Sequence, residues 1–169
     1  MTTQESIAAA RDQLNRTLGF FSRVDAKASV VLGVNTALIG VLATRAIPYS
    51  GLRWEWIPLL FTVVLLTASY WHLFREAFPS LDGGHESLLY FRSIATHREA
   101  KYLELWKKAS DEEHLNDLLG QVWRNSEILQ EKFDHMKWAF NCLALAIIPW
   151  LISLLALTVR LAKLTNGNS

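Results

Sequence analysis

Residues 138–159, WAFNCLALAIIPWLISLLALTV, decide the fold of this chain, because they form an uncharged run long enough to cross a membrane. The hydrocarbon core of a bilayer is about 30 Å thick, so a helix that crosses it needs roughly 20 apolar residues. Residues 56–74, WIPLLFTVVLLTASYWHLF, form a second run of that length. Residues 29–44, SVVLGVNTALIGVLAT, form a shorter third run. Ala46 and Ile47 extend it to residue 47, and the charged end of the Arg45 side chain can reach the membrane interface. The sequence therefore predicts an all-α integral membrane protein with three transmembrane helices.

Charged residues lie before and between these runs and define the remaining parts of the chain. The parts that we expect, in order, are an amphipathic helix (1–28), span 1 (29–47), a loop (48–55), span 2 (56–74), a helical region (75–137), span 3 (138–160) and a tail (161–169). Ser/Thr-x-x-Glu sequences have the spacing of a capping box and predict helix starts at Thr2, Thr96 and Ser110. Within the helical region we expect helices over 86–95, over 96–109, and from Ser110 into the third span.

The positions of lysine and arginine predict how the chain is oriented in the membrane. Of the seventeen, four precede the first span and nine lie in residues 75–137. Arg45 and Arg53 lie at or after the end of the first span, and Arg160 and Lys163 lie at or after the end of the third. In membrane proteins the cytoplasmic segments carry the excess of Lys and Arg. We therefore expect the N-terminus and the helical bundle of residues 75–137 in the cytoplasm. The C-terminus is then external.

Composition and motifs exclude several functions. The net charge is +1 and basic residues alternate with acidic ones, so the chain has no basic stripe that would bind nucleic acid. The single cysteine, Cys142, cannot form a disulfide within the chain. The histidines show no metal-ligand spacing, and no P-loop, GxSxG or CxxC sequence occurs. We therefore expect no catalytic residue, no metal site and no cofactor, and a protein that is not an enzyme.

A cluster of basic residues is a candidate for binding a phosphate group. It comprises Arg124, Lys132 and His135, with Arg92 and Arg98 from the preceding helices, and guanidinium groups match the oxygens of phosphate. Of these, Arg92, Arg124 and Lys132 are the predicted contacts. Each also has a plainer interpretation, because most charges on amphipathic helices belong to a solvated face. The sequence alone leaves both interpretations open.

The segment at which the N-terminal helix meets the membrane contains Asp25 and Lys27. An acidic side chain near a bilayer boundary usually has a partner. Asp25 therefore either forms an ion pair with a basic residue of another helix, such as Lys132 or Lys137, or takes part in ligand binding or gating.

Two asparagines lie within the predicted spans, Asn35 in the first and Asn141 in the third. Hydrogen bonding between helices is the commonest use of such groups in a membrane. Asn35 lies deeper, and it is also a candidate for lining a pore or for a contact between copies of the chain.

Three stretches resemble a known family: FFSRVDAKASVVLGVNTAL (20–38), SLLYFRSIA (87–95) and DLLGQVWRNSEILQEKFDHMKWAF (117–140). They are similar to the transmembrane effectors of the bacterial Pycsar anti-phage system. The resemblance covers nearly the whole chain, with Phe133 standing where a tyrosine is expected.

The resemblance implies a defence function. In that family a nucleotidyl cyclase senses infection and makes cyclic CMP or cyclic UMP. The effector then impairs the inner membrane, which halts the cell as an abortive infection. For this chain the resemblance implies the cell inner membrane, with the external C-terminus on the periplasmic side. Asp25, Lys27, Arg92 and Lys132 match recurring polar positions of the family, and their contact with the nucleotide is our hypothesis.

The expected partners follow from the same resemblance. They are a cyclic pyrimidine nucleotide made by a cognate cyclase, the lipid bilayer, and further copies of the chain, because three spans are too few to enclose a pore alone. The alternative function is a constitutive membrane scaffold whose cytoplasmic helices dock a protein partner.

Overall fold

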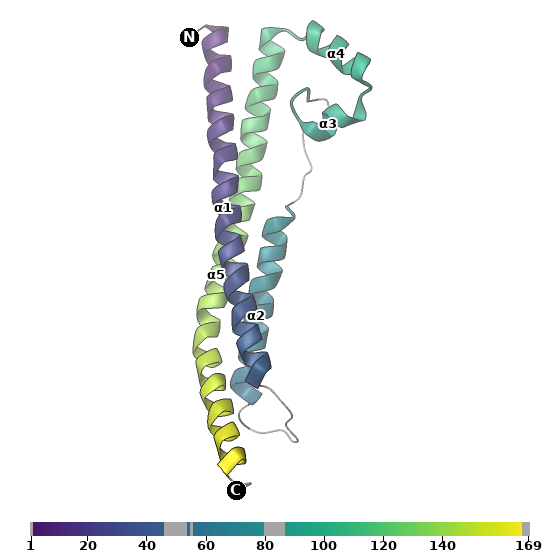
Figure 1. Cartoon of the computed structure of the whole chain (residues 1–169). Coiled ribbons are helices and arrows are strands. Elements are labelled where there is room, and N and C mark those ends of the chain that lie inside the picture. The colour runs from purple at the N-terminus through teal and green to yellow at the C-terminus, as the bar shows by residue number, and fades with distance from the viewer. Residues whose placement is uncertain (1, 46–53, 55, 80–86, 167–169) are drawn as a thin grey trace. The chain divides into compact units, whose positions relative to one another are not determined.

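The computed structural model describes residues 2–45, 54, 56–79 and 87–166, and these residues form five helices and no strand. The helices in chain order (Figure 1) are α1 (Thr3–Arg45), α2 (Trp56–Ala77), α3 (Phe91–Thr96), α4 (Glu99–Lys108) and α5 (Asp111–Asn166). Three of them, α1, α2 and α5, are long and apolar enough to cross a membrane. The prediction of an all-α protein with three membrane-spanning helices is therefore confirmed.

The chain divides into two compact units. Unit 1 comprises Met1–Val24 and Pro79–Lys132, and unit 2 comprises Asp25–Phe78 and Phe133–Ser169. Both α1, with 43 residues, and α5, with 56, continue from one unit into the other. The apolar half of each helix lies in unit 2, and the half that carries most of its charge lies in unit 1.

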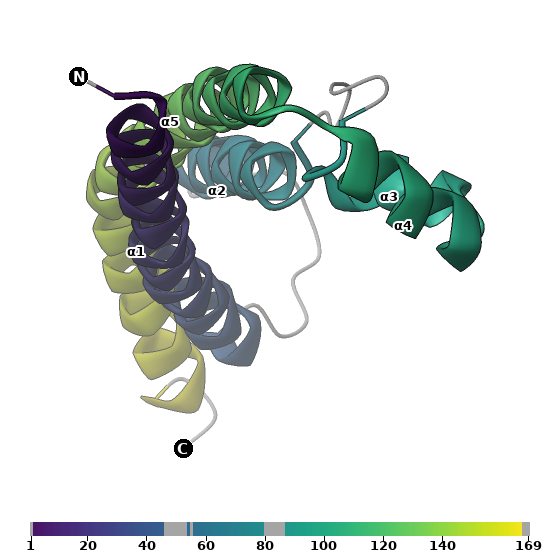
Figure 2. The same ribbon diagram turned by 90° about the horizontal axis from the view of Figure 1, so that it is seen from above.

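Unit 2 is built from three helices, with α2 beside α1 and α5 in both Figure 1 and Figure 2. Small side chains allow close packing of α5, where Ala139 and Ala146 are fully buried. Leu66 of α2 is buried in the same unit, and the indole Nε1 of Trp150 donates to the carbonyl of Leu38 at 3.0 Å, joining α5 to α1.

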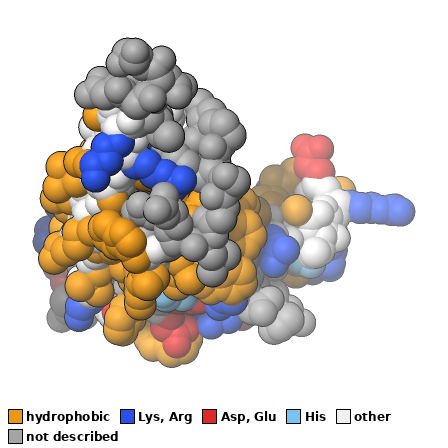
Figure 3. All heavy atoms as spheres, turned by 90° about the horizontal axis from the view of Figure 1, so that it is seen from below, with side chains coloured by type: hydrophobic (Ala, Val, Ile, Leu, Met, Phe, Trp, Pro, Cys, Tyr) orange, Lys and Arg blue, Asp and Glu red, His pale blue; other side chains and the backbone are white. Residues whose placement is uncertain are grey.

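The outward faces of these three helices remain apolar. Hydrophobic side chains cover much of the surface in Figure 3. Large hydrophobic residues with exposed side chains include Val30, Val34, Ile39, Ile57, Leu60, Phe61, Val64, Phe74, Phe140, Leu145, Ile148, Leu151 and Leu155. An apolar surface of this extent favours aggregation in water, whereas in a bilayer it can contact the hydrocarbon chains of the lipid.

Unit 1 has a small core between the first half of α1 and the first half of α5. Ile7 and Ala10 pack against Leu118, and Leu14, Leu89 and Leu115 contact this cluster. The α1 members are spaced by three and four residues, so they share one helix face. The segment around Leu89 completes the core from outside the two long helices.

Two of the three predicted capping boxes are present. Thr2 Oγ1 accepts from the N–H of Glu5 at 3.3 Å, and the Glu5 carboxylate accepts from the N–H of Thr2 at 2.7 Å. Ser110 and Glu113 make the same reciprocal pair, at 3.2 and 2.7 Å. These bonds satisfy N–H groups that a helix start leaves without partners.

The predicted helix start at Thr96 is wrong. Thr96 is the last residue of α3, and its hydroxyl donates back to the carbonyl of Ser93 at 2.7 Å. Helix α4 begins only at Glu99, with Arg98 as its N-cap and no side-chain capping bond. A Thr-x-x-Glu spacing therefore does not mark a helix start when the threonine hydroxyl bonds to the preceding turn.

The predicted helix over 86–95 is also wrong at its beginning, since α3 starts at Phe91. Ser87 Oγ accepts from the N–H groups of Leu89 and Tyr90, which form a turn there instead of a helix. Of the predicted loop 48–55, every residue but Trp54 lies outside the described residues, as do residues 46 and 47 of the predicted first span.

We expect Leu118→Ala to destabilise unit 1 by about 2–5 kcal/mol, because it leaves a cavity between α1 and α5. The neighbouring Leu119 is half exposed, so Leu119→Ala serves as the matched control and should change stability by less than about 0.5 kcal/mol. Amide hydrogen exchange over residues 3–24 of the purified protein measures both. Equal protection in the two variants would contradict the assigned core.

Candidate functional site

A chain of hydrogen bonds joins the three helices of unit 2. Asn35 Nδ2 of α1 donates to Ser69 Oγ of α2 at 2.8 Å, and Ser69 Oγ donates to the carbonyl of Ala139 on α5 at 2.9 Å. All three residues are fully buried. Because the bilayer interior offers no water, polar side chains there must find partners within the protein. Asn35 therefore holds together the helices of a single chain.

The amide of Asn35 is only partly satisfied. Its Oδ1 is buried and accepts no hydrogen bond from any part of the chain that the structure describes. A buried acceptor without a partner costs about 1–3 kcal/mol. The other predicted asparagine differs, because Asn141 is exposed on α5. The gating role expected for the two residues remains a prediction.

Two histidines meet at the end of α2. His72 Nδ1 and His135 Nδ1 of α5 lie 3.1 Å apart, and the centroids of their rings are 5.4 Å apart. The ring of His72 also stacks on Trp138, with centroids 6.2 Å apart and planes inclined by 20°. Both histidines are half-buried. Since 63 positions separate them in the sequence, local spacing gave no sign of the pair.

Unit 1 contains a connected polar group centred on Ser87. The carboxylate of Asp117 accepts from Ser87 Oγ at 2.6 Å and from the N–H of Leu88 at 2.9 Å. Gln121 Nε2 donates to the same Ser87 Oγ at 3.1 Å. Ser87 and Gln121 are buried. We call Ser87, Asp117 and Gln121 the serine clamp, because they hold the turn before α3 against α5.

The serine clamp explains why two stretches singled out in the sequence occur together. Ser87 begins SLLYFRSIA, and Asp117 and Gln121 lie one helical turn apart in DLLGQVW. The hydroxyl of Tyr102 in α4 adds a bond of 3.3 Å to the carbonyl of Leu88. Sequence reasoning missed all three clamp residues, because serine, aspartate and glutamine have no signature outside their tertiary contacts.

The basic residues predicted to bind phosphate lie in unit 1 but differ in their surroundings. Arg92 is exposed near the start of α3. Arg124 donates from Nη1 to Glu127 Oε2 at 3.1 Å, and a third of its side chain is exposed. Lys132 is buried, with 5% of its surface exposed. Lys132 follows Arg124 by two helical turns, about 12 Å along α5.

The other two predicted ligand residues belong to unit 2. Asp25 and Lys27 are both exposed on α1. Their predicted contact with a ligand, like that of the basic residues of unit 1, remains a hypothesis.

Two exposed aromatic side chains lie next to the predicted arginines. Trp123 precedes Arg124 and Phe91 precedes Arg92, and each aromatic side chain is 62% exposed. Exposed aromatic rings offer platforms on which a base can stack. Their place in helical sequence patterns was compatible with burial, so only the structure distinguishes them.

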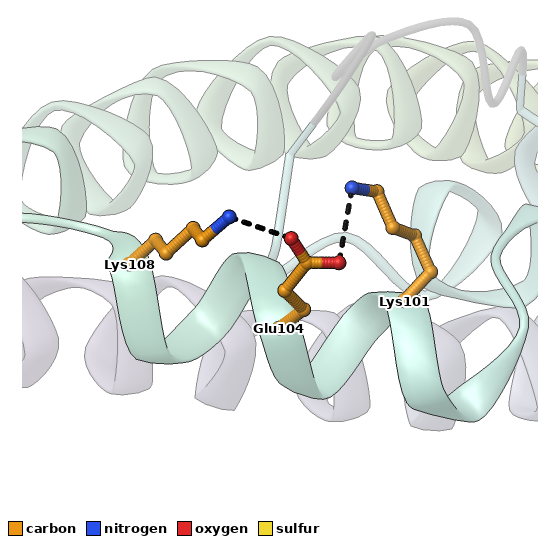
Figure 4. Close-up of polar contacts among 3 residues, drawn as sticks. All are labelled: Lys101, Glu104 and Lys108. Atoms are coloured by element: carbon orange, nitrogen blue, oxygen red, sulfur yellow. Dashed lines mark hydrogen bonds and ion pairs between the residues drawn. The ribbon is translucent and has the colours of Figure 1, made fainter.

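The acidic and basic residues of α4 and of the first turn of α5 have structural roles. Figure 4 shows Glu104 between Lys101 and Lys108, at 3.3 and 2.6 Å. Hydrogen bonds from Lys108 and then Lys101 lower the pKa of the Glu104 carboxyl below its ordinary value. Asp111 accepts from Gln4 Nε2 at 2.8 Å. Within the described residues, no three His, Cys, Asp or Glu side chains are grouped to hold a metal ion.

The serine clamp generates a stability prediction. Asp117→Ala removes the acceptor of two hydrogen bonds and should destabilise the docking of residues 87–90 on α5 by about 1.5–3 kcal/mol. Asn116→Ala is the matched control, because Asn116 is exposed on the preceding position of the helix. Limited proteolysis near residue 90 should accelerate in the Asp117 variant alone. Unchanged cleavage would exclude a clamping role.

The start of α5 should respond to pH. Hydrogen bonds from the N–H and the hydroxyl of Ser110 lower the pKa of the Glu113 carboxyl. A lowered pKa means that the ionised carboxylate stabilises the helix start above its unfolded-state pKa. This stabilisation is lost as the pH falls through the lower, folded-state pKa. Amide exchange at Ser110 and Glu113, corrected for intrinsic rates, should therefore lose protection at acidic pH. Glu113→Gln should remove that dependence, and a dependence equal to wild type would contradict the assignment.

Comparison with known proteins identifies a family. The model of the Pycsar effector protein domain matches residues 9–159 of the chain. No curated protein and no solved structure matches it. The matched range includes all of α2, most of α1 and α5, and the serine clamp.

Proposed function

Because the chain belongs to the Pycsar effector protein domain family, we propose that it is an anti-phage effector activated by a cyclic pyrimidine mononucleotide. Cyclic CMP or cyclic UMP, made by a cognate cyclase, is the proposed signal. The proposed response is damage to the inner membrane that ends in abortive infection. This activity depends on binding and rearrangement and needs no catalytic residue. The family match over residues 9–159 is the observation that carries the proposal.

The proposed orientation places unit 1 in the cytoplasm, where a nucleotide signal is made. The excess of Lys and Arg in residues 1–28 and 75–137 supports this orientation. Unit 2, whose outward faces are apolar, is then the part that spans the bilayer.

The chemistry of a cyclic pyrimidine nucleotide suits the surface of unit 1. Its phosphate carries one negative charge, which a single guanidinium can bind with two hydrogen bonds. Its base has an aromatic face that stacks on exposed aromatic side chains. Trp123 with Arg124 and Phe91 with Arg92 each offer such a combination within two consecutive residues. We place the nucleotide at one of these two pairs.

The proposed transmission uses the two continuous helices. Because α1 and α5 belong to both units, a change in how they pack in unit 1 is covalently connected to unit 2. A ligand can shift such an equilibrium only by binding the active arrangement more tightly. A nearly complete switch needs a difference of about 5.5 kcal/mol. The unsatisfied Oδ1 of Asn35 lowers the stability of the resting arrangement. It therefore reduces the difference in binding free energy that the ligand needs for the switch.

Membrane damage by this chain implies assembly. In the described residues of unit 2, the polar side chains of Asn35 and Ser69 are buried between the helices, and large apolar side chains face outward. Three such helices are too few to enclose a pore. We therefore propose that the active form is a homo-oligomer, in which the apolar faces of unit 2 contact other copies.

The test is uptake of an impermeant dye by cells that express the chain, with cyclic CMP or cyclic UMP supplied. We expect uptake with one of the two nucleotides, and at least tenfold less sensitivity to it in Arg124→Glu, which loses about 1.4 kcal/mol or more of binding. Arg16→Glu is the matched control, because Arg16 also pairs with an acid on its own helix, Asp12, at 2.8 Å.

The controls separate the alternatives. Equal sensitivity of Arg124→Glu and wild type would remove Arg124 from the site and direct the same test to Arg92. No uptake with either nucleotide, despite verified expression in the membrane, would contradict the effector function and favour the scaffold.

A further inference from the structure

The imidazoles of His72 and His135 take no part in the proposed function, and we infer that they form a binding site for a divalent transition-metal ion. The inference goes beyond the effector activity and does not depend on it. Zn²⁺ is the ion that the geometry suits and the probe for the test. The site lies within unit 2, between α2 and α5.

The distance between the two Nδ1 atoms is the main observation. At 3.1 Å they share one hydrogen bond, in which one Nδ1–H donates and the lone pair of the other Nδ1 accepts. Two nitrogens that share a proton direct their lone pairs at one point between them. An ion with two such ligands occupies that point in place of the proton. Zn–N bonds of about 2.0–2.1 Å at a tetrahedral angle separate two nitrogens by roughly 3.3 Å. The pair is therefore within a few tenths of an ångström of this arrangement.

The ligand type determines which ions bind. Neutral imidazole is a preferred ligand of Zn²⁺, Cu²⁺ and Ni²⁺, whereas Ca²⁺ and Mg²⁺ require oxygen ligands. No third His, Cys, Asp or Glu joins the pair in the described part of the chain. Water must therefore complete the coordination. His72 lies two residues before the end of the predicted second span and His135 three residues before the start of the predicted third span, so the pair lies near the predicted membrane boundary, where water is present. Two protein ligands give weaker binding than the four of a structural zinc site.

The surrounding packing preorganises the pair. The stack between His72 and Trp138 restricts the rotation of the His72 ring. His72 and His135 lie on helices whose contact is also held by the bond from Ser69 to the carbonyl of Ala139, one turn from each histidine. The site is thus complete only when α2 and α5 are packed together. An ion that binds there stabilises this packing, because it binds the folded arrangement and not the separated helices.

The test is calorimetric titration of Zn²⁺ into the full-length protein in detergent, after removal of metal with EDTA. We expect one ion per chain, with affinity weakened by more than tenfold in His72→Ala and in His135→Ala, since the loss of even an outer-shell partner costs about 10–100-fold. His97→Ala is the matched control, because His97 lies after α3 in unit 1. Mg²⁺ should produce no binding heat.

Two outcomes would overturn the inference: no Zn²⁺ binding to the wild type, or affinity that neither His72→Ala nor His135→Ala changes. If an alanine variant fails to fold by circular dichroism, His72→Asn replaces it. Its amide can still bond to the remaining imidazole but is a poor zinc ligand. Quenching by Cu²⁺ gives a second measurement, because the fluorescence lost on binding should decrease in Trp138→Phe. None of these measurements uses a nucleotide or a damaged membrane, so their failure is distinct from failure of the proposed function.

Discussion

Helices inside a bilayer gain little by burying apolar side chains against one another, because the surrounding lipid is equally apolar. Unit 2 must therefore be held by close packing and by polar contacts. Fully buried Ala139 and Ala146 provide the close packing, and the bonds from Asn35 to Ser69 and from Ser69 to Ala139 cross all three helices. Many large apolar side chains also face outward, an arrangement that a water-soluble protein avoids. Everything proposed for the membrane half depends on this small number of polar contacts.

Unit 1 follows the opposite rule, since its charged surface is that of a protein in water. Its core is small, with Ile7, Ala10 and Leu118 at the centre. The serine clamp adds a second, polar connection between residues that are about thirty positions apart in the sequence. The same two helices, α1 and α5, therefore pack as in a membrane protein in unit 2 and as in a water-soluble protein in unit 1. This division makes it reasonable that a soluble signal received in one half is answered in the other.

Periodicity and charge were sufficient to predict the helices, because a long apolar run and a capping box are properties of neighbouring residues. The starts at Thr2 and Ser110 were predicted for that reason. The start at Thr96 was mispredicted, because the local backbone decides whether the threonine hydroxyl caps the following helix or bonds to the preceding turn. Here the hydroxyl donates to the carbonyl of Ser93. The turn at Ser87 was missed because the acceptor that holds it, Asp117, lies on a distant helix. The histidine pair was missed for the same reason. Contacts between side chains that are distant in the sequence produce no local sequence pattern, so the sequence alone does not predict them.

The hydrogen bond between Gln4 and Asp111 joins residues 107 positions apart, and this separation governs how the protein is made. A ribosome releases the first half of α1 early, but its packing partner in α5 is synthesised only after two apolar helices have followed. During that interval the apolar face at Ile7, Ala10 and Leu14 has no counterpart from the same chain. At about 5–20 residues per second the delay lasts several seconds. Unit 1 is therefore completed only after the second half of α1 and all of α2 have been made, and residues 133–169 of unit 2 follow it. A nascent chain thus has two membrane-capable helices before it has the part that we propose controls them.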